Sequence, residues 1–240
     1  MSTASITIAE TPVARGDAAS VWSALVNATA TWIAIRPELF ESLDWEKLIA
    51  AAQYHGVLPI VAQRVLESPI ASEVDFATKE QLRRAFHANL IRGLPLADEV
   101  LRVMCSFADR QIPVIPYKGP VLAEHLWGNS ALRECADLDF LVETKNVDRA
   151  GEILEGLGYA RVSPVAQQLR RALLRNASEE QFQHRETGLL LELQWSPAPR
   201  VFALRCDVTA VWSSAREISF SGEPALAPSR WKETETLWQR

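Results

Sequence analysis

The segment from residue 114 to 142 constrains the fold more than any other part of the chain. It reads VIPYKGPVLAEHLWGNSALRECADLDFLV, with an apolar run that ends at Lys118, a short helical pattern, and a second apolar run. The second run opens with two aspartates, Asp137 and Asp139, separated by Leu138. Alternate side chains of a strand project to the same face, roughly 6–7 Å apart. The pattern therefore predicts two carboxylates side by side, with the intervening leucine in a core.

Two carboxylates on one face suit a pair of divalent cations about 3.5–4 Å apart, the arrangement used for in-line phosphoryl displacement. Lys118 beside a turn at Gly119, together with Arg133, could hold an anionic substrate nearby. Glu192 lies in a later alternating segment and could complete the metal shell if that strand pairs beside residues 138–142. The sequence leaves this register open. Each side chain also has a plain interpretation. The aspartates and Lys118 could be solvated residues at strand ends, and Glu192 could be a solvent-facing strand residue. Arg133 could pair with Glu134 or another exposed carboxylate.

The hydrophobic period changes from helical to alternating near residue 110, and this change predicts the organisation of the chain. The predicted parts are a polar mobile tail (1–17), a helical portion (18–110), a small α/β core (111–200) and a C-terminal segment (201–240). Gly93 and Pro95 interrupt the last helical pattern of the second part, so we expect a kink or a split there.

Shorter patterns predict the individual elements. Helices are expected over 18–34, 44–54, 58–66, 77–110, 120–127 and 146–157, and strands over 112–117, 138–142 and 159–162, the last at a sheet edge. Segments 181–185 and 189–195 flank Glu186-Thr187-Gly188 and predict a hairpin. A basic helix is expected over 165–176, with its three arginines on a solvated face rather than along a polynucleotide track. These arginines are Arg170, Arg171 and Arg175.

Charge and composition bound the function classes. The 240 residues carry a net charge of −5, which does not suggest sequence-independent nucleic-acid binding, since that relies on many Lys and Arg contacts to phosphate. Cys105, Cys135 and Cys206 are too few and scattered for a disulfide framework or a zinc site, and fit a reducing compartment. No apolar run approaches the roughly 20 residues needed to cross a bilayer, and the N-terminus lacks a secretory pattern. We therefore expect a cytoplasmic protein without a membrane partner; its oligomeric state is left open.

Several motifs together resemble a known family. In chain order they are Lys118-Gly119, Arg133, Asp137-x-Asp139, Gly158-Tyr159 and Glu192-Leu193-Gln194-Trp195. Their order resembles that of a family of uncharacterised bacterial nucleotidyltransferases in the polymerase-β-like superfamily. The helical segment DWEKLIAAAQYHGVLPIVAQRVL is also similar to that family, and the resemblance covers roughly residues 40–200. It implies an α+β fold, in which a helical N-terminal portion precedes a small mixed β-sheet flanked by helices.

The resemblance further implies a Mg²⁺-dependent enzyme that transfers a nucleoside monophosphate from an NTP to an acceptor hydroxyl. The residues implied as catalytic metal ligands are Asp137, Asp139 and Glu192. The residues implied in substrate binding are Lys118, Gly119 and Arg133. The partners are thus an NTP and an acceptor that the resemblance does not name.

The chain departs from the family pattern in ways that leave two alternatives open. Gly119-Pro120 replaces the usual Gly-Ser and so removes a hydroxyl and a backbone N–H. The interval between this turn and Asp137 is longer than usual. Gln194 stands where the family tends to have His. The chain also ends at WKETETLWQR, as a short member or a truncated product would. One alternative is a catalytically inactive binding or regulatory module. A less favoured one is a glycosyltransferase that uses its Asp-x-Asp to hold Mn²⁺ on a sugar nucleotide.

Overall fold

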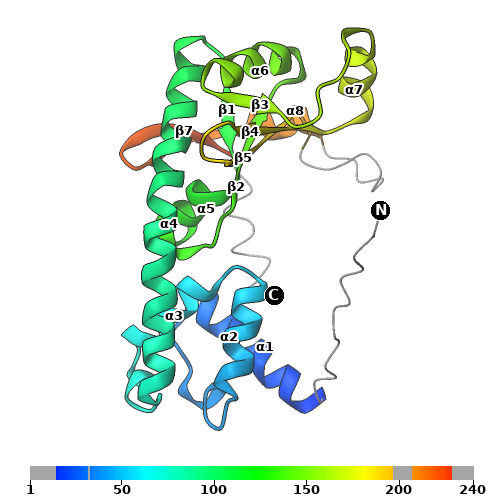
Figure 1. Cartoon of the computed structure of the whole chain (residues 1–240). Coiled ribbons are helices and arrows are strands. Elements are labelled where there is room, and N and C mark those ends of the chain that lie inside the picture. The colour runs from blue at the N-terminus through cyan, green and yellow to red at the C-terminus, as the bar shows by residue number, and fades with distance from the viewer. Residues whose placement is uncertain (1–14, 32, 197–206, 229–240) are drawn as a thin grey trace, which may run out of the picture. The chain divides into compact units, whose positions relative to one another are not determined.

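A computed structural model describes residues 15–31, 33–196 and 207–228 (Figure 1). The chain forms two compact units, Met1–Arg84 and Ala85–Arg240, which divide inside the long helix α4 (Phe76–Asp109). Most of the predicted N-terminal tail (1–17) and much of the predicted C-terminal segment lie outside the described residues, and residues 15–17 belong to α1. The four-part division expected from the sequence stays a prediction. Among the described helices, none is long and apolar enough to cross a membrane.

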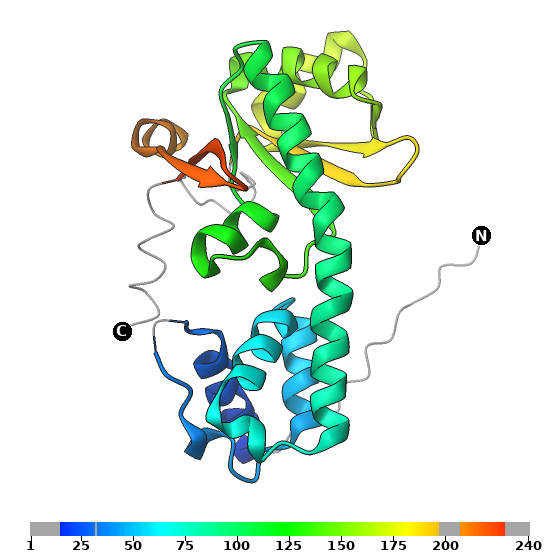
Figure 2. The same ribbon diagram turned by 90° about the vertical axis from the view of Figure 1, so that its left-hand side faces the viewer.

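The first unit is built from short helices that pack on one another (Figure 2). They are α1 (Arg15–Thr29), η1 (Pro37–Leu39), α2 (Trp45–Tyr54), α3 (Leu58–Glu67) and η2 (Pro69–Ser72), where η denotes a 3₁₀ helix. The Asp44 carboxylate caps α2 by accepting from the Lys47 N–H at 3.1 Å, and a proline lies in the first turn of α3. The helices predicted over 44–54 and 58–66 are confirmed, whereas the helix predicted over 18–34 runs over Arg15–Thr29.

Helix α4 runs without interruption through both sites at which we expected a kink or a split. It has 34 residues and contains Pro95, so the predicted split is wrong. A proline removes one N–H of the helical ladder, but Val100, Val103 and Phe107 in the following turns are buried in the sheet unit and hold the helix there. Gly93 lies beside Ala131, and a Cβ at this position would lie 3.9 Å from the Cα of Ala131, an ordinary van der Waals contact.

The second unit holds a five-stranded mixed sheet in the order β1-β2-β5-β4-β3. The strands are β1 (Val114–Pro116), β2 (Asp137–Val142), β3 (Tyr159–Arg161), β4 (Glu179–His184) and β5 (Leu190–Gln194). Only the β2–β5 pair of this sheet is parallel. The predicted hairpin is confirmed as β4–β5, and β3 lies at the edge as predicted. The mixed α+β fold class expected from the sequence is also confirmed.

Helices and a second small sheet complete this unit. They are α5 (Gly119–Trp127), η3 (Ser130–Leu132), η4 (Thr144–Asn146), α6 (Val147–Gly156), η5 (Gln167–Leu169), α7 (Arg170–Asn176) and α8 (Val208–Ser214), with strands β6 (Arg216–Phe220) and β7 (Glu223–Ala227). The sequence patterns predicted neither α8 nor the β6–β7 pair. Phe220 of β6 is nevertheless buried in the common core.

The sheet has one apolar face and one polar face. Leu138 and Phe140 of β2 are 1% and 0% exposed, as the alternation predicts. They share a core with α4 and α6, and the rings of Phe107 and Phe140 meet edge to face at 6.2 Å. Figure 1 shows α6 alongside this sheet. Asp137, Asp139 and their neighbours therefore belong to the face opposite the apolar core.

The basic helix differs from expectation at one arginine. Arg170 is buried, and its guanidinium contacts both carboxylate oxygens of the buried Glu180 at 2.9 Å and Asp148 at 2.5 Å. The prediction of a solvated face is therefore wrong for Arg170, because a carboxylate on the covered face of β4 requires a buried counter-charge. Arg171 and Arg175 are exposed, as predicted.

Candidate active site

The parallel pairing of β2 with β5 assembles the acidic residues. Asp139 is the direct register partner of Glu192, and Asp137 is the partner of Leu190. Side chains that are register partners project from the same face of a sheet. The tertiary structure thus settles the register that the sequence left open and brings Glu192 beside the aspartate pair.

Asp139 is the most buried carboxylate of this group, at 6% exposure. Its Oδ1 accepts hydrogen bonds from Lys118 Nζ and from Gln194 Nε2, each at 2.9 Å. The pKa of Asp139 is raised to about 6, chiefly by burial and also by the nearby charges of Asp137 and Glu192, while Lys118 opposes the shift. Removing water from a cluster of like charges makes the site electrostatically receptive to a cation.

The Lys118-Gly119 turn holds the lysine against β2. Lys118 is the extended residue that precedes α5, and its Nζ also lies 5.1 Å from the centre of the Tyr117 ring. Gly119 has a φ of +64°, a conformation that L side chains rarely adopt, and a Cβ there would lie 3.8 Å from the carbonyl oxygen of Asp137. Pro120 follows in the first turn and has no N–H. The glycine therefore provides the backbone donor at this turn.

Arg133 is held through its backbone. The buried amide of Asn89 in α4 donates to the carbonyl oxygens of Ala131 at 2.7 Å and of Arg133 at 3.1 Å. Gly93, one turn along α4, also lies next to Ala131. Within the described residues, the Arg133 guanidinium forms no ion pair with the acidic cluster on the sheet. The structure thus brings Lys118 to the carboxylates but not the side chain of Arg133. The sequence pattern that could have identified Asn89 is a polar residue on a helix face whose other positions are apolar.

Glu192 is fixed by side-chain amides. Gln181 Nε2 donates to its Oε1 at 3.1 Å, and Gln194 Nε2 donates to its Oε2 at 2.9 Å. The Tyr117 hydroxyl donates to Gln194 Oε1. Burial, with added repulsion from nearby carboxylates, raises the pKa of Tyr117, so the hydroxyl keeps its proton and remains a donor.

Sequence reasoning gave no site role to Tyr117 or Gln181, and it identified the buried Gln194 only as a departure from the family motif. It also missed Glu179, the register partner of Gln194, whose pKa is raised by burial and by the charge of Glu192. Alternation in the hairpin identifies Glu179 and Gln181 as residues of the same face. That signal locates them at the site only when the pairing of β5 with β2 is known.

The donor set fits a hard divalent cation by its chemistry, because Mg²⁺ prefers carboxylate oxygens. Throughout the described residues, however, no three His, Cys, Asp or Glu side chains are arranged to hold one ion. The positive charge beside Asp139 is the ammonium group of Lys118. The carboxylates are held at separate points by lysine and glutamine donors rather than converging on a single centre.

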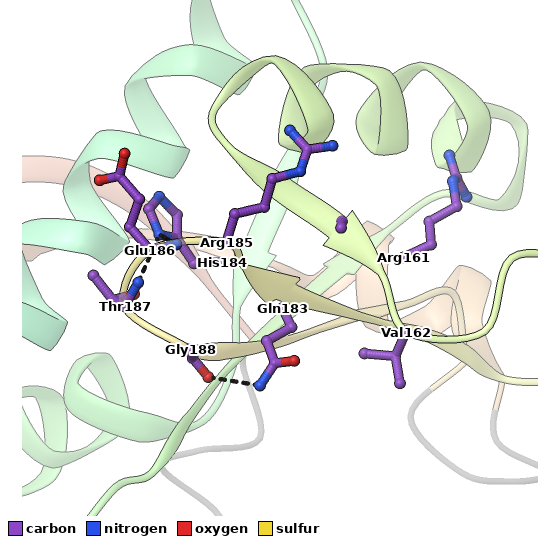
Figure 3. Close-up of a pocket in the computed structure, with 9 residues that line it drawn as sticks. Arg161, Val162, Gln183, His184, Arg185, Glu186, Thr187 and Gly188 are labelled. Carbon is purple, nitrogen blue, oxygen red and sulfur yellow. Dashed lines mark hydrogen bonds between the residues drawn. The ribbon is translucent and has the colours of Figure 1, made fainter.

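A concavity at another part of the sheet does not include these residues. It has a volume of about 600 Å³ and is lined by residues 160–162 of the β3 edge and 183–188 of the β4–β5 turn. Figure 3 shows the Gln183 amide reaching across this turn to the Gly188 carbonyl, a contact of 3.2 Å. It contains none of the acidic residues at the β2–β5 pair, so the candidate active site remains the polar face at that pair.

Comparison with known proteins identifies the class. The family described as uncharacterised nucleotidyltransferase matches residues 41–233, and the chain belongs to this family. The expectation of an enzyme of the nucleotidyltransferase class is thereby confirmed. A comparison with curated proteins finds no match.

Two solved structures are similar to parts of the chain. The first is ANT(2")-Ia in complex with adenylyl-2"-tobramycin, at 15% identity and a TM-score of 0.40, covering 56% of this chain and 70% of that one. The second is the lincosamide antibiotic adenylyltransferase LnuA with lincomycin bound, at 15% identity and a TM-score of 0.39, covering 60% and 85%.

Proposed function

We propose that this chain is a Mg²⁺-dependent nucleotidyltransferase that moves a nucleoside monophosphate from an NTP to an acceptor hydroxyl. The observation that carries the proposal is the pairing of Asp139 with Glu192 on adjacent parallel strands, with Asp137 on the same face and Lys118 in contact. Membership of a nucleotidyltransferase family favours this chemistry over glycosyl transfer from a sugar nucleotide.

The three carboxylates do not converge on one centre in the structure and would have to move together to hold Mg²⁺, which when bound would supply positive charge to the phosphate oxygens of the NTP. The acceptor oxygen would attack the α-phosphorus, the bond from that phosphorus to the bridging oxygen would break, and pyrophosphate would leave. Glu192 is the half-buried carboxylate next to Asp139 and would direct the acceptor hydroxyl and receive its proton.

The remaining predicted residues would position the triphosphate. Lys118 has a side chain that is 42% exposed, so its ammonium can turn from Asp139 to an incoming phosphate. The N–H of Gly119 begins α5, where the helix dipole favours an anion. Arg133 follows η3, and its planar guanidinium would pair with phosphate oxygens of the bound nucleotide.

The test compares wild-type protein with an Asp137→Asn/Asp139→Asn variant. Calorimetry with ATP, GTP, CTP and UTP at millimolar Mg²⁺ should show nucleotide binding that the double variant loses. Glu186→Gln is the matched control, because this exposed carboxylate lies in the β4–β5 turn away from the cluster, and it should bind as wild type does.

A transfer assay in cell extract distinguishes the reaction class. Label in the α-phosphate of the NTP should appear on an acceptor, whereas label in the γ-phosphate should leave as pyrophosphate. Transfer of the γ-label instead would contradict nucleotidyl transfer. Absence of binding and of transfer with all four NTPs would favour the inactive binding module.

A further inference from the structure

We propose that the acceptor is a small, uncharged molecule rich in hydroxyl groups, and that it binds on the polar face of the sheet beside the carboxylates. This inference rests on the proposed function and deepens it, because it names the substrate class of the acceptor. The surface concerned is the neutral half of the polar face, defined as Ala160, Val162, Gln181, Gln183 and Leu190.

The strand register joins the neutral half to the candidate active site. Leu190 of β5 is the register partner of Asp137 on β2 and of Gln183 on β4. Neighbouring strands lie about 4.8 Å apart, so Gln183 lies about 10 Å from Asp137 across the face. In the next row, Gln181 of β4 is the partner of Glu192. A small molecule that lies on Gln183 therefore reaches the carboxylates with one of its ends.

The two glutamines of the neutral half offer hydrogen-bond acceptors to a ligand. Gln183 Nε2 donates to the Gly188 carbonyl at 3.2 Å, and Gln181 Nε2 donates to Glu192 at 3.1 Å. Both partners only accept, so each amide nitrogen must face its partner and each amide oxygen faces away. Figure 3 shows the Gln183 oxygen pointing away from Gly188. Both glutamines are exposed, so their oxygens are open to a ligand that donates, as a hydroxyl group does.

The charges around the neutral half disfavour an anionic acceptor. The neutral half contains no charged side chain, and the adjoining positions on β2 and β5 hold carboxylates. Lys118 lies at the β2 end, where it contacts one of these carboxylates. The guanidinium groups of Arg161 and Arg185 project to the opposite side of the strands from Val162 and Gln183 (Figure 3). A phosphate or carboxylate group on the acceptor would therefore be repelled without a nearby cation to offset the repulsion.

Exposed apolar side chains and a concavity favour a small molecule. Leu190 and Val162 are 40% and 48% exposed, although they belong to a polar face. Ala160, Val162 and Gln183 also line the concavity of about 600 Å³ at the β3 edge, a volume typical of small-molecule sites. The aliphatic side chains would pack against the carbon skeleton of a polyol, while the amide oxygens accept from its hydroxyl groups.

The experiment supplies the protein with α-labelled NTPs and with cell extract separated by ultrafiltration. Label should be transferred to a species of the low-molecular-weight fraction. Acceptor activity should pass through both an anion-exchange and a cation-exchange resin, because the acceptor is uncharged. Periodate cleaves bonds between neighbouring hydroxyl-bearing carbons, so pretreatment of the fraction, followed by quenching, should destroy the acceptor activity.

Two variants test the surface itself. Leu190→Ser should raise several-fold the amount of the low-molecular-weight fraction needed for half-maximal transfer, and Gln183→Leu should raise it roughly 2- to 10-fold through the loss of one neutral hydrogen bond. Neither should change NTP affinity measured by calorimetry. Leu169→Ser is the matched control, because Leu169 is 56% exposed in η5, outside the sheet, and it should behave as wild type does. Circular dichroism checks that each variant is folded.

The outcomes separate this inference from the proposed function. Label on protein or nucleic acid alone, or acceptor activity that either resin retains or that survives periodate, overturns the inference and leaves the proposed reaction standing. Equal half-saturation in Leu190→Ser, Gln183→Leu and Leu169→Ser overturns the docking surface. NTP binding without transfer to any fraction overturns the inference and favours the inactive binding module. A protein that neither binds NTP nor transfers label overturns both proposals together.

Discussion

Glu180 is a buried carboxylate on the covered face of β4 that two arginines neutralise. Its side chain is 4% exposed, and those of its partners Arg161 and Arg170 are 17% and 9% exposed. The contacts are 2.5 Å from Arg161 Nη1 and 2.9 Å from Arg170 Nη1. Glu180→Gln keeps the shape of the side chain and removes its negative charge. The two buried guanidinium groups are then left with less negative charge nearby to balance them.

Breaking a buried ion pair by removing one partner costs about 3–5 kcal/mol. The lower end applies here, because Arg161 retains Glu155 and Arg170 retains Asp148, whose side chains are 43% and 58% exposed. We therefore expect a loss of about 3 kcal/mol in the free energy of unfolding. For a unit of this size, such a loss lowers Tm by about 6–12 °C.

The assay is thermal and urea unfolding at pH 7, followed by circular dichroism. Glu155→Gln is the control, because it removes the exposed partner of the same Arg161, and exposed pairs contribute about 0–1 kcal/mol. A Glu180→Gln protein that is as stable as the Glu155→Gln protein would refute the argument that burial determines the strength of this network.

Two further predictions concern residues of the candidate site. Gly119→Ala should destabilise by about 1–2 kcal/mol through its φ of +64°, since the added Cβ has room, whereas Gly156→Ala in α6 should stabilise by about 0.5–1 kcal/mol; urea titrations that show the same sign for both would contradict this. Asp139→Asn should raise the Tm of metal-free protein at pH 8, because the pKa of Asp139 is about 6 rather than 3.8, so ionised Asp139 disfavours the fold. The folded state binds the Asp139 proton more tightly than the unfolded state, so wild type gains stability as the pH falls from about 6 toward 3.8. The difference in Tm between Asp139→Asn and wild type should therefore narrow between pH 8 and pH 5. A difference that does not narrow would count against the burial of this carboxylate.

Features that depend on neighbouring residues along the chain can be predicted from the amino-acid sequence. Alternation located Asp137 and Asp139 on one face and Leu138 in the core, and the Glu186-Thr187-Gly188 turn determined the β4–β5 hairpin. The capping aspartate and the early proline determined the starts of α2 and α3. These signals are local because hydrogen bonds and side-chain periodicity act over a few residues.

Which strands pair with one another depends on contacts between distant parts of the chain. The parallel pairing of β2 with β5 joins segments some fifty residues apart and puts Glu192 opposite Asp139, and no local pattern specifies that register. Other tertiary contacts bury Gln194 between carboxylates, give Arg170 a buried partner on β4, and pack α4 beyond Pro95 into the core. Each of these outcomes depends on burial against distant parts of the chain, where packing and charge compensation outweigh local propensity.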